Sequence, residues 1–394
     1  MSTVNCDYQK LVENYYKSPK VQEAFKIVEE SRTELIEDWK KLASTYSPSG
    51  NEKLRAEYLV SKFKEFGCNH TYIDRTGNAL ALFDSRKQGP NTVFLVTMDD
   101  LKTVAELVKS WEKPRELREG KLIGPGTNIG SICTTGLILA KLFARGDFKG
   151  RIYVVGCTEE ETGFAGTKGF LSDHPEINYI IDIMGGYGGI SYGALCIRWM
   201  KIHYKGSEAH TLEGPGPNVT KGVAKSIQRM FAIPLPLNSF LNISMLGAGT
   251  VFNHRGDDGW HSVDLRSLDQ SVVDSITELI KESAEDVARE EGLEAWLEFV
   301  VDTRGGQIPG ARDSPLTRIA EESVKILGKE PRLSNRGSCN MNAGIAAGVF
   351  SISTGGDRGG RRGYTDEYSN IDPIFTGMKL NFLIGYILGE GLMQ

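Results

Sequence analysis

Residues 151–163, with the sequence RIYVVGCTEEETG, contain the feature that decides the fold. The apolar run at 152–155 predicts a buried β-strand, and three consecutive glutamates, Glu159, Glu160 and Glu161, follow soon after it. A run of acids is often no more than a solvated turn. In parallel α/β sheets, however, reactive groups lie just past the carboxyl ends of the strands, so the position of these glutamates favours a functional site.

Polar groups follow other predicted strands in the same way. These segments are Thr97-Met98-Asp99-Asp100, Gly124-Pro125-Gly126-Thr127-Asn128, Asp182 and Gly363-Tyr364-Thr365-Asp366-Glu367. Because the carboxyl ends of parallel strands meet at one edge of a sheet, we expect all of these segments to line one rim. A shared rim makes an isolated acidic turn the less favoured interpretation.

The order of predicted elements indicates two domains, one inserted in the other. Strands and helices alternate up to residue 194 and again from about 312, which predicts an α/β layer with a largely parallel sheet. Between these segments the order strand, helix, strand, strand, helix, strand is that of a ferredoxin-like α+β domain. We therefore predict an α/β domain at 1–194 and 310–394, and an inserted domain at 195–309.

Hydrophobic patterning places these elements along the chain. A helical pattern over 7–45 that Pro19 divides predicts two helices, followed by a turn at 47–50 and a helix ending near Phe66. Further predicted strands are 79–83, 93–97, 151–156, 179–184, 196–204, 241–245, 261–266, 296–301 and 349–353, and further predicted helices are 132–145, 166–172, 219–231, 270–291, 315–328 and the segment after Pro373.

Length and composition exclude several classes of protein. A chain of 394 residues is longer than one hydrophobic core usually serves, and 46 basic against 51 acidic side chains give a net charge of −5, which argues against nucleic-acid binding. No apolar run approaches the roughly 20 residues of a membrane helix, and the first residues lack the apolar core of a signal peptide. Six widely separated cysteines without a CxxC pair argue against a disulfide framework. We expect a cytoplasmic protein that binds neither nucleic acid nor membrane.

From about residue 20 to 390 the chain resembles the M20 family of metallopeptidases and amidohydrolases, which contains peptidase T, carboxypeptidase G2 and aminoacylases. The motifs that carry the resemblance are Ser47-Pro48-Ser49-Gly50-Asn51-Glu52, Asp74-Arg75-Thr76-Gly77-Asn78, Arg118-Glu119-Gly120-Lys121-Leu122 leading into Gly124-Pro125-Gly126, Glu160-Glu161-Thr162-Gly163-Phe164-Ala165-Gly166, Gly206-Ser207-Glu208-Ala209-His210 and Thr365-Asp366-Glu367-Tyr368. Their order and spacing together are specific for the fold.

The resemblance implies an architecture and a mechanism. The architecture is a zinc-peptidase-like three-layer α/β domain with an inserted ferredoxin-like lid, through which the protein forms a homodimer. Family enzymes hold two zinc ions with two histidines and three acidic residues, and a further glutamate activates the attacking water. In this sequence Glu161 matches the metal-binding glutamate and Glu160 matches the general base.

Several of the family's metal ligands are replaced. Thr97 stands where the first histidine is expected, Asn128 where the bridging aspartate is expected, and Gly363 where the final histidine is expected. Asp99, which supports the first histidine in the family, remains. At the fourth acidic-ligand position, the alignment register allows either Asp182 or Met184.

Zinc requires about four good ligands, mostly imidazole, thiolate or carboxylate. A threonine hydroxyl and a neutral amide are poor substitutes, so we do not expect the two-zinc mechanism. Two alternatives remain: one hard divalent cation held by Glu161, Asp99, Asp182 and waters, or no metal.

Without two dications the acidic rim needs another source of positive charge. Arg358, Arg361 and Arg362 lie where the final histidine is lost, and we hypothesise that at least one of them enters the former metal site and pairs with Glu160 or Glu161. The alternative is a mobile basic surface loop. These arginines, with Asn128, are also candidates for contacts with a substrate.

The residues at the family's substrate-binding positions resemble the family more closely than those at its metal-ligand positions. His210 matches the lid histidine that stabilises the developing oxyanion, and Asn253 matches a substrate-contacting asparagine. Arg304 lies where a family arginine binds a substrate carboxylate. Each could be structural alone, but together they imply a small carboxylate-bearing ligand.

Two functions from different classes follow. One is an enzyme that acts on the C–N bond of a small amide or amidine, peptide or non-peptide, with Glu160 and His210 as catalytic groups and one metal ion or none. The other is a non-catalytic family member that uses the old pocket to bind a metabolite or a partner.

Overall fold

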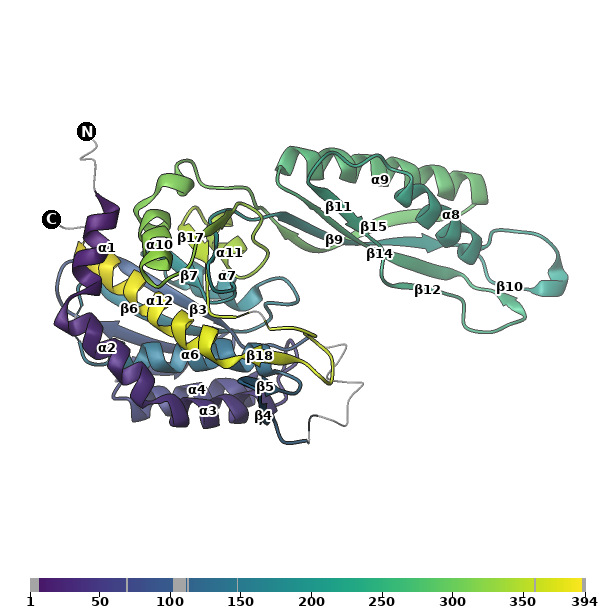
Figure 1. Cartoon of the computed structure of the whole chain (residues 1–394). Coiled ribbons are helices and arrows are strands. Elements are labelled where there is room, and N and C mark those ends of the chain that lie inside the picture. The colour runs from purple at the N-terminus through teal and green to yellow at the C-terminus, as the bar shows by residue number, and fades with distance from the viewer. Residues whose placement is uncertain are drawn as a thin grey trace. The chain divides into compact units, whose positions relative to one another are not determined.

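The computed structural model describes residues 7–68, 70–101, 111, 113–146, 148–357 and 359–391. The chain divides into two compact units, and in Figure 1 the one at 195–306 is coloured teal to green. We call Met1–Ala194 with Gln307–Gln394 the α/β unit, and Leu195–Gly306 the inserted unit.

The α/β unit is built on one eight-stranded sheet. Its strands, in spatial order, are β1 (His70–Ile73), β2 (Ala79–Asp84), β6 (Arg151–Cys157), β3 (Asn91–Thr97), β7 (Tyr179–Asp182), β17 (Phe350–Ser353), β8 (Gly189–Ser191) and β16 (Arg332–Ser334). Neighbours are parallel from β6 through β3 and β7 to β17 and at β8–β16, but antiparallel at β1–β2, β2–β6 and β17–β8. The prediction of a largely parallel sheet therefore holds for the centre and for the β8–β16 pair, and it is wrong for the three antiparallel pairs. The short strands β1, β8 and β16 were not predicted.

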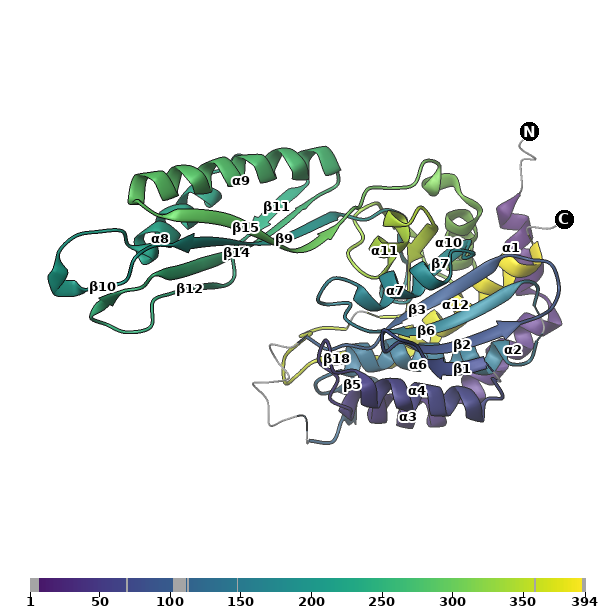
Figure 2. The same ribbon diagram turned by 180° about the vertical axis from the view of Figure 1, so that it is seen from behind.

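Helices cover both faces of this sheet, which confirms the three-layer α/β fold. Val154 of β6 faces Gly136 of helix α6 (Thr127–Phe143), whereas its neighbour Tyr153 contacts Phe170 of helix α7 (Ala165–Asp173) edge to face. Successive side chains of a strand point to opposite faces, so α6 and α7 lie on opposite sides of the sheet (Figure 2).

The other helices of this unit follow the predicted pattern, except that the short helix at 341–346 was not predicted, the segment 7–45 breaks once more and the last helix begins earlier. The helices are α1 (Tyr8–Tyr16), α2 (Pro19–Glu30), α3 (Arg32–Ser44), α4 (Lys53–Glu65), α10 (Pro315–Ile326), α11 (Met341–Ala346) and α12 (Ile371–Gly391). The segment 7–45 forms three helices rather than two, because the chain also breaks at Ser31, where no proline or glycine marks the break. Helix α12 begins before Pro373, since proline is tolerated in the first turn. It is also apolar enough over 20 residues to match a membrane span, contrary to our expectation, but 78% of that window is buried inside the fold.

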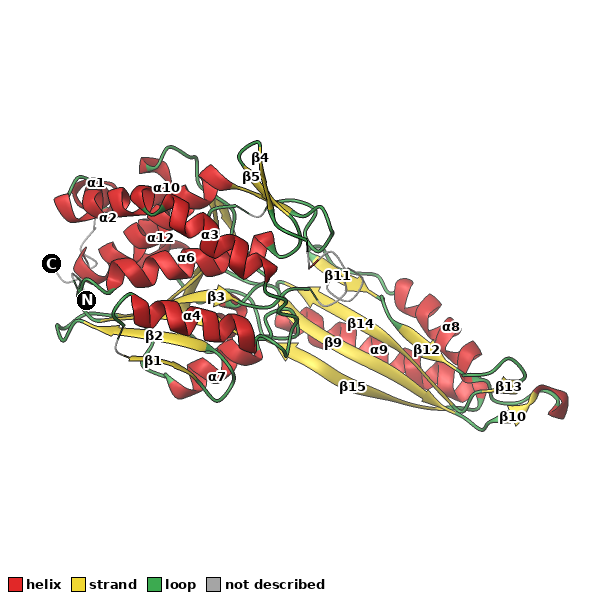
Figure 3. Ribbon diagram, turned by 90° about the horizontal axis from the view of Figure 1, so that it is seen from below, coloured by secondary structure: helices red, strands yellow, loops and turns green. Residues whose placement is uncertain are grey.

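The inserted unit has the ferredoxin-like order, as predicted. Its strands are β11 (Ser239–Asn242), β14 (Asp258–Ser267), β9 (Cys196–Lys205) and β15 (Glu294–Thr303) in spatial order, with β12 (Leu246–Ala248) also on β14. Helices α8 (Val219–Phe231) and α9 (Gln270–Glu291) cover one face (Figure 3). The predicted strand at 241–245 is wrong at its last three residues, because β11 ends at Asn242 and the amides of Ser244 and Met245 donate to the hydroxyl of Ser262.

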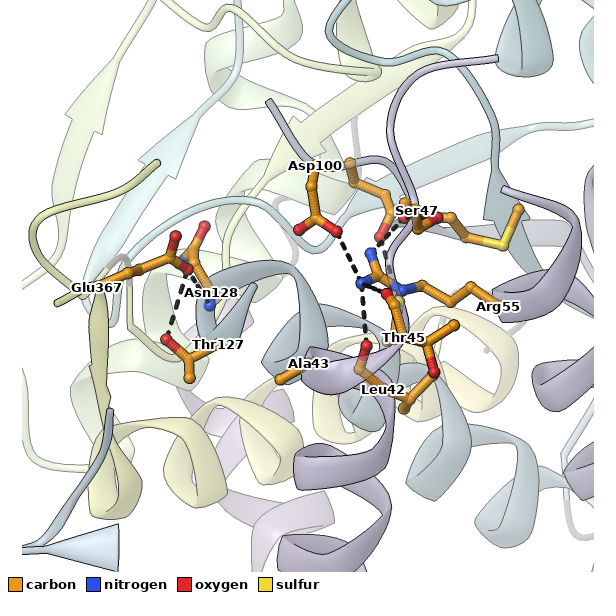
Figure 4. A network of polar contacts seen from close by, with 12 residues as sticks. Leu42, Ala43, Thr45, Ser47, Arg55, Asp100, Thr127, Asn128 and Glu367 are labelled. Atoms are coloured by element: carbon orange, nitrogen blue, oxygen red, sulfur yellow. Dashed lines mark hydrogen bonds and ion pairs between the residues drawn. The ribbon is translucent and has the colours of Figure 1, made fainter. Parts of the chain in front are cut away.

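A buried arginine joins two helices of the α/β unit to the end of β3. Arg55 of α4 has no exposed side-chain surface, and it donates to the carbonyls of Leu42 (2.9 Å) and Thr45 (2.7 Å) and to the carboxylate of Asp100 (2.8 Å) (Figure 4). Burial raises the pKa of Asp100 to about 7, although the Arg55 guanidinium opposes this shift. These contacts of Arg55 fix the chain just after β3, where it reaches the rim.

We predict that Arg55→Met lowers the free energy of unfolding by about 3–5 kcal/mol, because it leaves the Asp100 carboxylate buried without its cation. Urea unfolding measures this change, and Lys53→Met on the exposed side of α4 is the control, with a cost of about 0–1 kcal/mol. Adding Asp100→Asn to Arg55→Met should recover part of the loss. Equal effects of the Arg55 and Lys53 substitutions would contradict the assigned role.

Candidate functional site

The acidic turn after β6 is held by carboxylates from two other segments. The amide of Glu159 donates to Glu52 Oε1 (2.9 Å), and the amides of Glu160 and Glu161 donate to Asp99 Oδ1 and Oδ2 (both 3.0 Å). Glu159 itself has a φ of 54°, a left-handed conformation that non-glycine residues seldom adopt. Three successive amides thus fix the direction in which the glutamate side chains leave the backbone.

Asp99 organises this turn from a fully buried position just after β3. Besides the two amides, its Oδ2 accepts the Ser49 hydroxyl at 2.6 Å. Both oxygens of Asp99 therefore accept hydrogen bonds from the protein, and they hold the acidic turn and the loop at Ser49 together. The position of Asp99 on the rim was predicted from the sequence, but its role as an acceptor was not, and Glu52 was not predicted as part of the site.

Glu160 is the buried member of the turn, with 6% of its surface exposed. Burial raises its pKa well above the ordinary value, and the nearby charges of Glu161 and Asp99 raise it further, while Arg362 opposes the shift. Glu160 consequently holds a proton more tightly than an exposed glutamate does. A carboxyl group in such surroundings is suited to proton transfer.

Arg362 forms an ion pair with Glu161 next to this group. The two side chains are 29% and 18% exposed, so the pair is partly shielded from water. Burial alone would lower the pKa of the Arg362 guanidinium, but the carboxylates of Glu161 and Glu160 outweigh it and raise that pKa. The structure thus pairs one of the three candidate arginines with Glu161, as hypothesised, and the location of a former metal site at this point stays a prediction.

The other two arginines differ. Arg361 pairs with Asp366 at 3.1 Å, and both side chains are more than half exposed, at 55% and 60%. Its guanidinium also lies over the Tyr364 ring. Arg358 lies outside the described residues.

The replaced ligand positions take part in hydrogen bonds that support the fold. Thr97 Oγ1 accepts from Asn340 Nδ2 at 3.0 Å. Glu367 accepts the amide of Asn128 at 2.7 Å (Figure 4). It also accepts the amide of Gly363 at 3.0 Å, and the two contacts join the start of α6 to the Arg362 loop. The contact with Asn128 also explains why α6 begins at Thr127, ahead of its predicted start at 132: the capping carboxylate lies far away in the sequence.

The two candidates for the fourth acidic position are both buried. Asp182 ends β7 with no exposed surface, and its Oδ2 accepts the amide of Met341 at the start of α11 (3.0 Å). Met184 is 6% exposed. Within the described part of the chain, no group of three or more histidines, cysteines, aspartates and glutamates is arranged to hold a metal ion. The assignment of Glu161, Asp99 and Asp182 as metal ligands stays a prediction.

In the inserted unit, His210 and Asn253 lie together. They are brought together by a short ribbon of β10 (Ala209–His210) and β13 (His254–Arg255), and their ring Nε2 and amide Nδ2 are 3.3 Å apart. His210 is half-buried and Asn253 is exposed. Arg304, just past β15, is exposed. The first two predicted residues are thus neighbours, and their roles remain predictions.

Comparisons with known proteins agree on one family. The model of peptidase family M20/M25/M40 matches residues 96–382. A protein of Thermococcus kodakarensis, named as a proposed LysW-lysine/LysW-ornithine hydrolase, is 29% identical over 45% of this chain and 44% of its own length. The match thus spans less than half of that curated relative.

Solved structures show the same fold at low sequence identity. Aminopeptidase PepT from Bacillus cereus has a TM-score of 0.73 and 19% identity, and covers 91% of this chain and 98% of its own. A tripeptidase from Staphylococcus aureus has a TM-score of 0.75 and 20% identity, with the same coverage of 91% and 98%.

We predict that Arg362→Met lowers the free energy of unfolding by about 1–3 kcal/mol, because it leaves Glu161 and its acidic neighbours without their cation. Arg361→Met is the matched control, since its partner Asp366 is exposed, and it should cost about 0–1 kcal/mol. Chemical denaturation of both variants tests this. If the two substitutions cost the same, the Arg362 pair is only a surface contact.

Glu160→Gln should change how stability depends on pH. Because the pKa of Glu160 is raised in the folded protein above its ordinary 4.5, the wild type loses stability as the pH rises from 4.5 through the folded pKa. The neutral glutamine does not, so the variant should gain on the wild type by roughly 1.4 kcal/mol per pH unit across that interval. Urea unfolding between pH 4 and 8 in EDTA measures this difference. Parallel curves for the wild type and the variant would contradict it, and Glu159→Gln serves as the control.

Proposed function

Because the chain belongs to the peptidase family M20/M25/M40, whose members are hydrolases, we propose that it acts on the C–N bond of a small amide or amidine that carries a carboxylate. In this proposal the guanidinium of Arg362 takes the place of the paired metal ions. One observation carries the proposal: Arg362 pairs with Glu161 beside the buried Glu160.

The side chains on the rim are poor ligands for a pair of zinc ions. Thr97, Asn128 and Gly363 offer a hydroxyl, an amide and no side chain where strong ligands are needed. Both oxygens of Asp99 already accept hydrogen bonds, and a fixed guanidinium on Glu161 would repel a dication. These residues do not fit two zinc ions, so no step is assigned to them.

The remaining residues support proton transfer and orientation. A glutamate whose pKa is raised is a stronger base when ionised and keeps its proton to a higher pH, which are the properties required of Glu160. Arg362 would orient a substrate carboxylate or carbonyl oxygen with donors not used by Glu161. His210 and Asn253 are proposed as oxyanion donors and Arg304 as a carboxylate clamp. Dimerisation through the inserted unit stays a prediction.

A second candidate is a non-catalytic protein that binds a metabolite or partner at this rim. This second candidate is favoured by the structural roles of the retained acids. Asp99 accepts hydrogen bonds from the acidic turn, and Glu161 forms an ion pair with Arg362. Those contacts explain why both acids are present without any need for chemistry.

The test combines elemental analysis with turnover assays on the full chain. Purified protein is assayed for bound metals and then, with and without EDTA, for cleavage of a panel of N-acyl amino acids and carboxylate-bearing amidines. We predict cleavage that survives EDTA and a loss of about a hundredfold or more in kcat/KM for Glu160→Gln. The control is Glu159→Gln, which changes the adjacent acid and should keep full activity.

Each other outcome decides against a named part of the proposal. Two bound metal ions per chain and complete loss of activity in EDTA would overturn metal-free chemistry. Full activity of Glu160→Gln would remove Glu160 from the mechanism. Tight binding of a panel member without turnover would establish the second candidate in place of the first.

A further inference from the structure

Strand β15 of the inserted unit is an edge strand, with one side of its backbone unpaired. Within this unit, all of whose residues the structure describes, β15 pairs only with β9 and ends the sheet (Figure 3). The register of that pairing shifts between Phe299 and Val301, so the pairing is regular over 294–299. An edge strand presents unpaired N–H and C=O groups to any extended chain that reaches it. The regular stretch is long enough for a short peptide strand to pair with it.

On one face of β15 an exposed tryptophan lies between two exposed acids. Leu297 packs against the core under α8 and α9, so by alternation Glu294, Trp296 and Glu298 point to the opposite face, which we call the open face. Trp296 is 45% exposed, the Glu298 side chain is 48% exposed, and Glu294 is exposed as well. The whole of β15 contains three acids and no lysine or arginine.

Neighbouring lysines offset this charge only in part. Lys201 of β9 lies 3.9 Å from Glu298 Oε2, a long separation for an ion pair. Lys205 is the residue opposite Glu294, but it pairs with Asp257 at 2.6 Å. The open face of β15 is therefore acidic, and it attracts a cationic partner more strongly than a neutral or anionic one.

Two aromatic side chains of β15 define what each face of an added strand would contact. His203 stacks on one side of the Trp296 indole, with ring centroids 4.9 Å apart and planes within 2° of parallel. Phe299 lies on the helix-covered face, since it pairs with Met200 of the core and the Arg198 guanidinium lies over its ring, and it is 55% exposed. A tryptophan ring attracts a cation, whereas exposed apolar surface is best covered by an apolar side chain.

We propose that the β15 edge binds an extended peptide segment of another protein, in which basic side chains alternate with apolar ones. The segment adds a strand to the sheet through backbone hydrogen bonds. Its basic side chains lie opposite Glu294, Trp296 and Glu298, and its apolar side chains cover the face that carries Phe299. The same acids oppose pairing with a second copy, because two β15 strands would bring like charges together. The inference rests on contacts within the inserted unit and not on the proposed function.

Binding of short capped peptides to the full chain tests the kind of partner. The probe is a labelled peptide in which lysine and valine alternate, measured by fluorescence anisotropy. Its comparators have the lysines gathered in one block, glutamate in place of lysine, or N-methyl groups on the central residues, which remove the backbone donors. We expect the alternating peptide to bind and each comparator to bind about tenfold more weakly or worse. No binding of the alternating peptide, or equal binding of its N-methylated form, would overturn the proposal.

Variants and hydrogen exchange locate the peptide. The double variant Glu294→Gln, Glu298→Gln should bind about three- to tenfold more weakly, because two cross-strand charge pairs are lost. The control is Glu278→Gln, Glu282→Gln, which removes the same charge from exposed positions of α9 and should bind normally. The peptide should also slow hydrogen exchange of the backbone amides at 294–299.

Three results of these measurements would refute the proposal. The first is equal weakening in the two double variants, and the second is slowed exchange only outside 294–299. The third is slowed exchange at 294–299 that appears when the free chain is concentrated, which would assign the edge to a second copy. Circular dichroism confirms that each variant is folded.

Discussion

The bonds from the amides of Glu160 and Glu161 to the buried Asp99 carboxylate are the constraint on which the site depends. They fix two consecutive backbone units at the end of β6, and the Glu52 contact fixes the unit before them. A turn held in this way fixes the points at which the three glutamate side chains leave the backbone. The backbone geometry of the rim is thus set by residues of the chain itself.

Holding the acids together creates an electrostatic cost that the chain offsets with its own cation. Burial disfavours the ionised form of Glu160, and the nearby charges of Glu161 and Asp99 add to this effect. Arg362 supplies the positive charge from a loop that Glu367 joins to the start of α6. A tethered guanidinium is always present and always charged, but it cannot polarise a carbonyl as a bound metal ion does. In the function that we propose, Arg362 therefore supports orientation and proton transfer rather than metal-assisted attack.

The sequence predicted what depends on periodicity and missed what depends on distant contacts. Helix α8 and the long helix α9 have strong apolar faces and were placed correctly, whereas β8 and β16 are too short to carry a pattern. The start of α6 was missed because its capping acid, Glu367, is remote in sequence. The acids after β6 were recognisable from their position, but the use of Asp99 as their acceptor depends on how β3 and β6 pair, which no local signal reveals.

The arginines show why the rest of the site could not be predicted without the three-dimensional structure. Arg361 and Arg362 are adjacent in sequence, yet one is paired on the surface and the other faces the buried acids. Among the described residues, the buried and unpartnered Nε and Nη1 atoms of Arg255 could not be foreseen either, because an unsatisfied donor is defined only by what surrounds it. The contacts of an arginine in this chain thus depend on how much water its guanidinium has lost and which acceptors replaced that water.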